Sequence, residues 1–408
     1  MSMSFGKFAV DYEARIDFER LRKERLEKAK KQMIKDGLGA VITWDADTIR
    51  YLSGHYITTP LRAAQNHACI LARNGDPVVF SAGTLEVRQK QMPWLKGKVF
   101  PELMNPKFCR ATKDVAPIVK AVADVMAEHG LTREPLGIDG STSEFLLGEA
   151  FKEAGIQAVD AKRTMVEART IKTRDEVELL RIACANTEPA FAAIADAIRP
   201  GVRECDLVGV AAKVLFENGC DHMEDLVVCS GEHTNPFDLQ FTDKPIRPGE
   251  LIYIDIDAAA YMGYKPCVYR TFSCGKATAE QKEVYEECRA MLYSAIEAIK
   301  PGVTTDVIVR GWPQSPEYWG RKTWPEVTPL AVGHGIGLSL HEMPFFTPPI
   351  ARTSPVRLEE NMMLALETWV GRPGGKFGVR LEEDVRVTRD GYEVLTKFPI
   401  DEITECWI

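Results

Sequence analysis

Two histidines in a glycine-rich segment, Val332–Pro344, are the first candidates for chemistry. His334 and His341 are seven residues apart, and the segment also holds three glycines. Imidazole is the commonest side-chain metal ligand and the usual general acid or base near neutral pH. Glycine lets the backbone approach another group closely. The segment therefore indicates a site, with an ordinary core or surface histidine as the alternative for either residue alone.

Four carboxylates interrupt segments that are otherwise apolar and predicted to be strands. Asp255 and Asp257 alternate within 251–257 and so point to one face, while Glu367 and Glu382 lie in the segments 363–370 and 378–388. Buried carboxylates repel one another unless a cation or protons intervene. Each acid alone has a plain alternative, a solvated position on an edge strand. Together with His334 they predict a centre for a divalent cation.

The composition narrows the class of protein. The chain has 408 residues, 45% of them hydrophobic and 27% charged, and a formal net charge of −8. The acidic balance disfavours a nucleic-acid partner. The sequence shows no apolar run long enough for a bilayer and no signal peptide, and its ten cysteines form no Cys-x-x-Cys pair. We therefore expect reduced thiols, no membrane partner and a cytoplasmic location.

The pattern of elements predicts two domains. Strands alternate with helices over residues 1–163, which predicts a small α/β domain, and residues 164–408 form the second. Thr173 and Glu176 form a capping box at the start of a long helix. A helix, a Pro-Gly-Val turn and another helix occur twice, around Pro200 and Pro301, which indicates two related halves.

Several motifs follow one another in the order found in a known superfamily. They are Tyr51-Leu52-Ser53-Gly54, Arg169-Thr170-Ile171-Lys172, Gly263-Tyr264, Arg270-Thr271-Phe272, the His334 segment, Leu366-Glu367-Thr368, Arg380-Leu381-Glu382 and Gly391-Tyr392-Glu393. The chain thereby resembles the pita-bread hydrolases, which include prolidase, aminopeptidase P, methionine aminopeptidase and creatinase. The resemblance implies an α+β fold: a creatinase-type N-terminal domain and a pita-bread domain of curved antiparallel sheet backed by helices, with pseudo-two-fold symmetry. It also implies a homodimer.

The resemblance assigns roles residue by residue. His334, Glu367 and Glu382 fall on metal-ligand positions, and His341 falls on a histidine that contacts substrate and stabilises developing charge. Arg380 falls on an arginine that supports the site, and it is also expected to bind substrate. Tyr264, in the family hairpin, is expected to bind substrate.

Two positions depart from the peptidase pattern. Cys267 stands where the second aspartate is expected, so that either Asp255 or Asp257 is the remaining aspartate ligand. Thr234 replaces a family histidine, with His233 beside it. The Asp-x-Asp and the run from Ser230 to Pro236 are similar to dimethylsulfoniopropionate lyase and ectoine hydrolase, and creatinase works through a histidine near its Asn-Pro.

Cys267 has three interpretations: a thiolate ligand that favours zinc, an inert buried thiol, or a nucleophile activated by His233 or His341. The metal is expected to be zinc, manganese or iron, with one ion favoured over two, or none.

The leading interpretation is a hydrolase that cleaves a C–N bond in a small polar substrate. Glu367 would shuttle a proton and His341 would stabilise the oxyanion. In a metal-free variant His233 or His341 would be the base. The alternatives are a metal-dependent lyase that acts by β-elimination and a catalytically inactive binding module.

Overall fold

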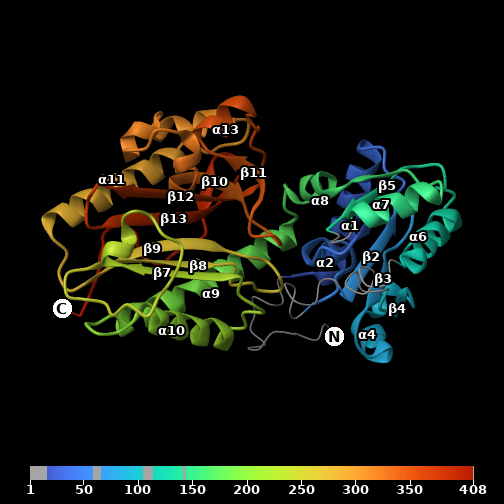
Figure 1. Cartoon of the computed structure of the whole chain (residues 1–408), viewed down its shortest axis with the longest axis horizontal. Coiled ribbons are helices and arrows are strands. Elements are labelled where there is room, and N and C mark those ends of the chain that lie inside the picture. Colours follow the sequence, from blue (N-terminus) through green and yellow to red (C-terminus); the bar gives the residue numbers. More distant parts are fainter. Residues whose placement is uncertain (1–15, 58–65, 104–113, 141–143, 408) are drawn as a thin grey trace. The chain divides into compact units, whose positions relative to one another are not determined.

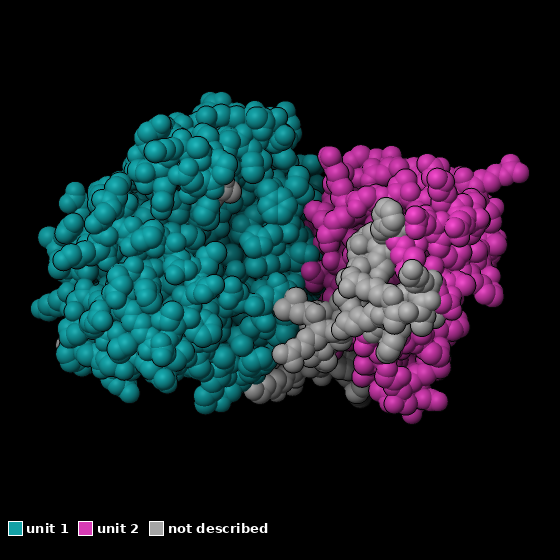
Figure 2. Space-filling model, in the orientation of Figure 1, with its two compact units in different colours: residues 1–16, 170–408 teal, residues 17–169 magenta. Residues whose placement is uncertain are grey.

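A computed structural model describes residues 16–57, 66–103, 114–140 and 144–407. It divides into two compact units, Asp17–Arg169 and the residues from Thr170 onward (Figure 2). The predicted boundary after Arg163 falls inside the helix α8 (Lys162–Arg169), which packs against α1 (Phe18–Lys35) and so stays with the first unit. Residues 1–15, 58–65, 104–113 and 141–143 of the predicted first domain lie outside the described residues.

The first unit is built on a mixed six-stranded sheet with the order β4-β3-β2-β1-β5-β6 (Figure 1). Its strands are β1 (Ala40–Thr43), β2 (His67–Ala72), β3 (Val78–Ser81), β4 (Val99–Pro101), β5 (Leu136–Asp139) and β6 (Ala158–Asp160), and its other helices are α2 (Ala46–Ser53), α4 (Leu85–Gln91), α6 (Ala116–Glu128) and α7 (Glu144–Glu153). Apolar residues of β1, β2 and β5 pack with those of α6 and α7 into one core.

A small polar cluster is buried in this unit. His55 Nε2 lies 3.1 Å from His67 Nδ1, and Ser81 Oγ lies 3.1 Å from each of these nitrogens. Both imidazoles are almost fully buried. Burial, together with the charge of His67, lowers the pKa of His55 to about 3, and burial with the charge of Arg88 lowers the pKa of His67 to about 4. Both rings are therefore neutral at pH 7.

The second unit contains two sheets, in which every strand pair but one is antiparallel. A four-stranded sheet has the order β15-β9-β8-β7, and a five-stranded sheet has the order β11-β10-β12-β13-β14. The strands are β7 (Asp225–Ser230), β8 (Leu251–Asp257), β9 (Cys267–Cys274), β10 (Ala331–Gly335), β11 (Glu342–Phe346), β12 (Met363–Gly371), β13 (Gly378–Val387), β14 (Tyr392–Val394) and β15 (Thr404–Cys406), the last pairing parallel to β9. The helices are α9 (Arg174–Ala197), α10 (Glu204–Glu217), α11 (Ala279–Ile296), α12 (Thr305–Ile308) and α13 (Pro348–Thr353).

Helices cover one face of each sheet (Figure 1). Ile252, Ile254 and Ile256 of β8 pack against α9 and α10. Leu364 and Leu366 of β12 pack against α11. Each such side chain contributes about 1.5–3 kcal/mol when it is fully buried. Because neighbours along a strand alternate in direction, the residues between these apolar positions point to the other face of their sheet.

The two sheets join where β9 lies against β13. Thr271 Oγ1 donates to the Arg380 carbonyl (2.7 Å) and accepts from the Arg380 amide (3.1 Å). The Arg270 guanidinium donates to the Glu382 carbonyl (2.5 Å) and forms a buried ion pair with Glu383 (2.8 Å). These contacts hold the inner face of β8 and β9 against the inner face of β12 and β13.

The predicted repeat and capping box are both present. Thr173 and Glu176 cap α9 reciprocally. Gly201 and Gly302 have φ of +88° and +87°, and their amides donate to the carbonyls of Ile246 (2.9 Å) and Leu358 (2.8 Å). Each half of this unit therefore begins with the same turn between two helices. Among the described helices, none has both the length and the apolar character needed to cross a bilayer.

Candidate metal centre

Three of the predicted ligands form one tight, buried group. The ligand atoms of Cys267, His334 and Glu382 all lie within 4.8 Å of one another. The same holds for Asp255, Asp257 and Cys267, so the cysteine belongs to both groups. The first group comes from β9, β10 and β13, and therefore from both sheets, whereas the second lies on β8 and β9 of the four-stranded sheet.

Strand register explains why these residues meet. Asp257 pairs directly with Cys267 across β8 and β9, and Glu367 pairs directly with Glu382 across β12 and β13. His334 pairs with Ala365, which is two residues from Glu367 and so points to the same face. Each sheet thus carries its acids on the face opposite the helices, and the junction of β9 with β13 brings these two faces together.

His334 is prepared to act as a neutral ligand. Its side chain is buried, and Nδ1 lies 3.0 Å from the Gly335 carbonyl, which accepts a proton held on that nitrogen. Burial lowers the pKa of His334 to about 4, so the ring is neutral at pH 7. The Nε2 lone pair then remains for a cation, the arrangement in which a backbone acceptor sets the tautomer of a histidine ligand.

The donor atoms of the cluster fit a divalent cation. Within the described part of the chain, no hydrogen-bond partner reaches His334 Nε2, either carboxylate oxygen of Glu382, or Oδ1 of Asp255 and of Asp257. Burial raises the pKa of Asp255 and of Glu382 well above the ordinary range, and repulsion from neighbouring acids raises both further. Unpartnered buried oxygens that repel one another are what a bound cation would stabilise.

Glu367 differs from the other acids because it has a cationic partner. The guanidinium of Arg380 forms a buried ion pair with Glu367 and donates to the Pro329 carbonyl (2.6 Å). The same guanidinium lies 4.6 Å from the ring centroid of Phe237 and 5.0 Å from that of Tyr269. Arg380 is therefore fixed against the cluster and holds Glu367 in place.

Comparison with known proteins shows the family of this chain. Residues 178–389, more than half of the chain, match metallopeptidase family M24. The chain belongs to family M24. Residues 25–171 match the creatinase/prolidase N-terminal domain. The predicted superfamily and its two-domain α+β fold are thereby confirmed, and membership places the chain among hydrolases.

Individual relatives of this M24 chain differ in the activity that their names state. The Xaa-Pro dipeptidase of Pyrococcus furiosus is 28% identical over 387 residues, which is 92% of this chain and 98% of that protein. Dimethylsulfoniopropionate lyase DddP of Roseovarius nubinhibens is 26% identical over 424 residues, covering 98% of this chain and 91% of that protein. The structure of an Xaa-Pro dipeptidase from Bacillus anthracis superposes with a TM-score of 0.75 at 23% identity, over 94% of this chain and 99% of that one, which shows the fold.

The other predicted site residues of the M24 chain lie at different distances from the cluster. The ring of His341, which is exposed, lies 4.4 Å from that of His334. Tyr264 is buried, and its hydroxyl donates to Glu176 at 3.0 Å, which ties the β8–β9 hairpin to α9. Substrate binding by Tyr264 stays a prediction.

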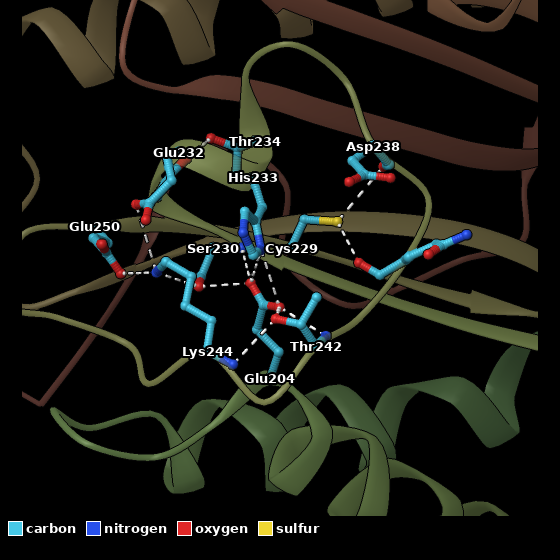
Figure 3. A network of polar contacts seen from close by, with 12 residues as sticks. Glu204, Cys229, Ser230, Glu232, His233, Thr234, Asp238, Thr242, Lys244 and Glu250 are labelled. Atoms are coloured by element: carbon cyan, nitrogen blue, oxygen red, sulfur yellow. Dashed lines mark hydrogen bonds and ion pairs between the residues drawn. The ribbon is translucent and has the colours of Figure 1, made fainter.

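His233 is held in a separate polar network (Figure 3). Its Nδ1 lies 3.1 Å from Glu204. The fully buried Glu204 carboxylate also accepts from the amides and hydroxyls of Ser230 and Thr242, at 2.7–2.9 Å. Ser230 pairs with Ile252, at the opposite end of β8 from Asp257. The imidazole of His233 is therefore directed to Glu204, and its catalytic role stays a prediction.

Sequence reasoning missed two sets of polar residues near the centre. Asp384, two residues after Glu382 on the same face of β13, accepts from the Cys267 amide (3.2 Å) and the Cys184 thiol (3.3 Å). The alternation of β13 could have identified it. Lys265 and Glu224 form an ion pair of 2.5 Å beside the β8–β9 hairpin. No pattern in the sequence indicated that pair.

The glycines of the histidine segment have a specific structural purpose. A Cβ at Gly335 would lie 2.2 Å from the Met343 carbonyl oxygen, and one at Gly337 would lie 2.6 Å from the Glu342 carboxylate. Glu342 is buried and paired with Lys172 at 3.0 Å. These glycines therefore allow the backbone beside His334 to approach β11 and this ion pair closely. These contacts position the strand that carries His334.

Proposed function

We propose that this chain is a metal-dependent hydrolase that cleaves a C–N bond in a small polar substrate. The observation that carries the proposal is a set of buried ligand atoms from two adjoining sheets, in Asp255, Asp257, His334 and Glu382, that have no hydrogen-bond partner among the described residues. A divalent cation bound by these residues would supply Lewis-acid stabilisation of charge that develops on a substrate oxygen.

The residues around the cluster can perform the remaining steps. The Glu367 carboxylate, held by Arg380, is placed to accept a proton from water and return it to the leaving nitrogen. The accessible ring of His341 can donate a hydrogen bond to the oxyanion. Arg380 keeps Glu367 in position and does not itself need to meet the substrate.

Relatives named Xaa-Pro dipeptidase support an imino-acid dipeptide as the first substrate to test, with other small amides and amidines next. The match to a lyase along nearly the whole chain, and the Asp255-x-Asp257 pair, support a second candidate, β-elimination from a small carboxylate. The two candidates differ in whether water enters the product.

The test is product analysis in water enriched with ¹⁸O. Metal-loaded protein is incubated with a panel of Xaa-Pro dipeptides, small amides and amidines, and dimethylsulfoniopropionate, and the products are analysed by mass spectrometry. A hydrolase places one ¹⁸O atom in the product that receives the hydroxyl group. A lyase leaves an unsaturated product without label, which would replace the proposal by the second candidate.

Two variants test whether turnover depends on the proposed metal ligands. Glu382→Ala removes a proposed ligand and should abolish turnover together with bound metal. Glu360→Gln changes an exposed acid of the same unit and should leave both unchanged. Absence of turnover on every compound, by protein with bound metal, would favour an inactive binding module.

We also propose a homodimer, which the family resemblance supports, and a cytoplasmic location, which the cysteines without a Cys-x-x-Cys pair support. Sedimentation equilibrium of the full chain at several concentrations tests the assembly, and a monomer at all of them would contradict it.

A further inference from the structure

Cys267 occupies the place where both ligand groups meet. Its sulfur lies within 4.8 Å of the ligand atoms of His334 and Glu382, and likewise of those of Asp255 and Asp257. Its side chain is 3% exposed, and its amide donates to Asp384 at 3.2 Å. Strand pairing with Asp257 and this backbone contact together fix the direction of the thiol.

The surroundings of this thiol differ from those of an ordinary buried cysteine. Cys288, equally buried, donates to the Thr368 carbonyl at 3.3 Å inside an apolar core. The thiol of Cys267 lies instead among the carboxylates of Asp257 and Glu382 and the imidazole of His334. Each of these groups also has a buried polar atom without a hydrogen-bond partner among the described residues, which is not the environment expected of an inert cysteine.

A nucleophilic role is less well supported by the geometry. A thiol nucleophile needs a base within hydrogen-bond reach. His233 is bound to Glu204 beyond the far end of β7, because Ser230 pairs with Ile252 whereas Cys267 pairs with Asp257. The imidazole of His334 lies within 4.8 Å of the Cys267 sulfur, but its Nε2, which has no partner among the described residues, belongs to the same ligand group.

We propose that Cys267, His334 and Glu382 form one tight site of mixed sulfur, nitrogen and oxygen ligands, selective for zinc-like cations over manganese and magnesium. The inference rests on the proposed metal-dependent function and specifies its metal. As the metal–sulfur bond forms, the thiol proton leaves to solvent, so the ligand is the thiolate. Asp255 and Asp257 then offer only oxygen ligands to any second ion.

The selectivity follows from ligand softness. Thiolate and imidazole favour Zn²⁺ and its cobalt substitute, whereas manganese and magnesium favour carboxylate oxygen and water. A second ion would share Cys267 with the first and would be held otherwise by two aspartates. We therefore expect one equivalent of metal to bind tightly and a further equivalent, if any, to be removed easily by dialysis.

The test uses cobalt as a spectroscopic substitute for zinc. Metal-free full-length protein is loaded with Co²⁺, dialysed, analysed for bound metal, and examined for the near-ultraviolet charge-transfer absorption of a cobalt–thiolate bond. The wild type should retain one equivalent and show the band. Cys267→Asp should retain cobalt and lose the band, and its preference for Zn²⁺ over Mn²⁺ in competition should be smaller. Cys288→Ser, a buried control outside the centre, should keep both metal and band.

The outcomes separate the inference from the proposed function. Cobalt bound by the wild type without the thiolate band would overturn the role of Cys267 and leave a metal centre of oxygen and nitrogen ligands. A band that persists in Cys267→Asp would place the thiolate elsewhere and also overturn it. Protein that binds no cobalt or zinc would overturn the metal-dependent function itself.

Discussion

Glu382→Gln is expected to stabilise the metal-free protein while it weakens metal binding. Glu382 is fully buried and neither carboxylate oxygen has a partner among the described residues. Its charge is opposed by burial and by the nearby acids Glu367, Asp255, Asp384 and Asp257. In the absence of a cation its pKa is therefore raised well above the ordinary value, which favours the protonated form. A glutamine has nearly the same shape and needs no proton.

The magnitude follows from the ordinary pKa of 4.5 for this carboxyl group. Keeping it protonated at pH 7 costs about 1.4 kcal/mol per pH unit over 2.5 units, or about 3.5 kcal/mol at most. For a unit of this size that maximum corresponds to a rise in melting temperature of roughly 7–14 °C. Because the folded-state pKa is raised, the cost is absent below pH 4.5 and grows as the pH rises. The difference between variant and wild type should therefore vanish near pH 4.5.

The assay is thermal unfolding of chelator-treated protein at pH 4.5, 6 and 7, each with and without saturating zinc. Zinc at one hundred times its dissociation constant should stabilise the wild type by about 2.7 kcal/mol, and should stabilise the variant much less. Glu360→Gln, on the surface, should follow the wild type throughout. A metal-free variant that melts at or below the wild-type temperature at pH 7 would refute the argument that Glu382 is a buried, unsatisfied acid.

Three other perturbations test separate parts of the structure. Lowering the pH from 7 to 5 should destabilise the unit 17–169 by about 2 kcal/mol for each of His55 and His67. Their pKa values of about 3 and about 4 lie below the ordinary 6.5, so stability is lost as the unfolded chain takes up protons. Hydrogen exchange of the amides in β1 and β2 should become faster, and unchanged exchange would contradict the prediction. Glu383→Gln leaves the buried charge of Arg270 without its ion-pair partner and should cost about 3–5 kcal/mol in urea unfolding, where a loss under 1 kcal/mol would contradict a buried pair. His334→Ala should lower bound zinc, measured by mass spectrometry of the metal, and retention of the full equivalent would exclude His334 as a ligand.

Strand periodicity made much of the centre predictable. Because side chains alternate along a strand, two aspartates at positions i and i+2 in 251–257 had to share a face, and the apolar residues between them had to face helices. The same reasoning applied to Glu382 also reaches Asp384, which the sequence analysis did not identify. The capping box at Thr173 was readable because its two side-chain contacts are local.

Other features depended on contacts that no local pattern carries. The segments of β10 and β11 hold glycines and prolines, which disfavour strands, and become strands because Gly335 allows Met343 to approach. The direction of the His233 side chain is set by Glu204, which is far away in the sequence and is held by Ser230 and Thr242. A histidine next to an expected catalytic position therefore gave no indication of where its ring points.

The structure also alters the choice between Asp255 and Asp257 as the aspartate ligand. Sequence spacing relative to Cys267 offered one or the other, because family peptidases use a single aspartate there. Both lie within 4.8 Å of the Cys267 sulfur, and Oδ1 of each has no partner among the described residues. Both aspartates therefore remain candidates as ligands, and Cys267 is the residue that they share with His334 and Glu382. In the proposed centre its sulfur stands where the family pattern has an oxygen, so the choice of metal would depend on this one residue.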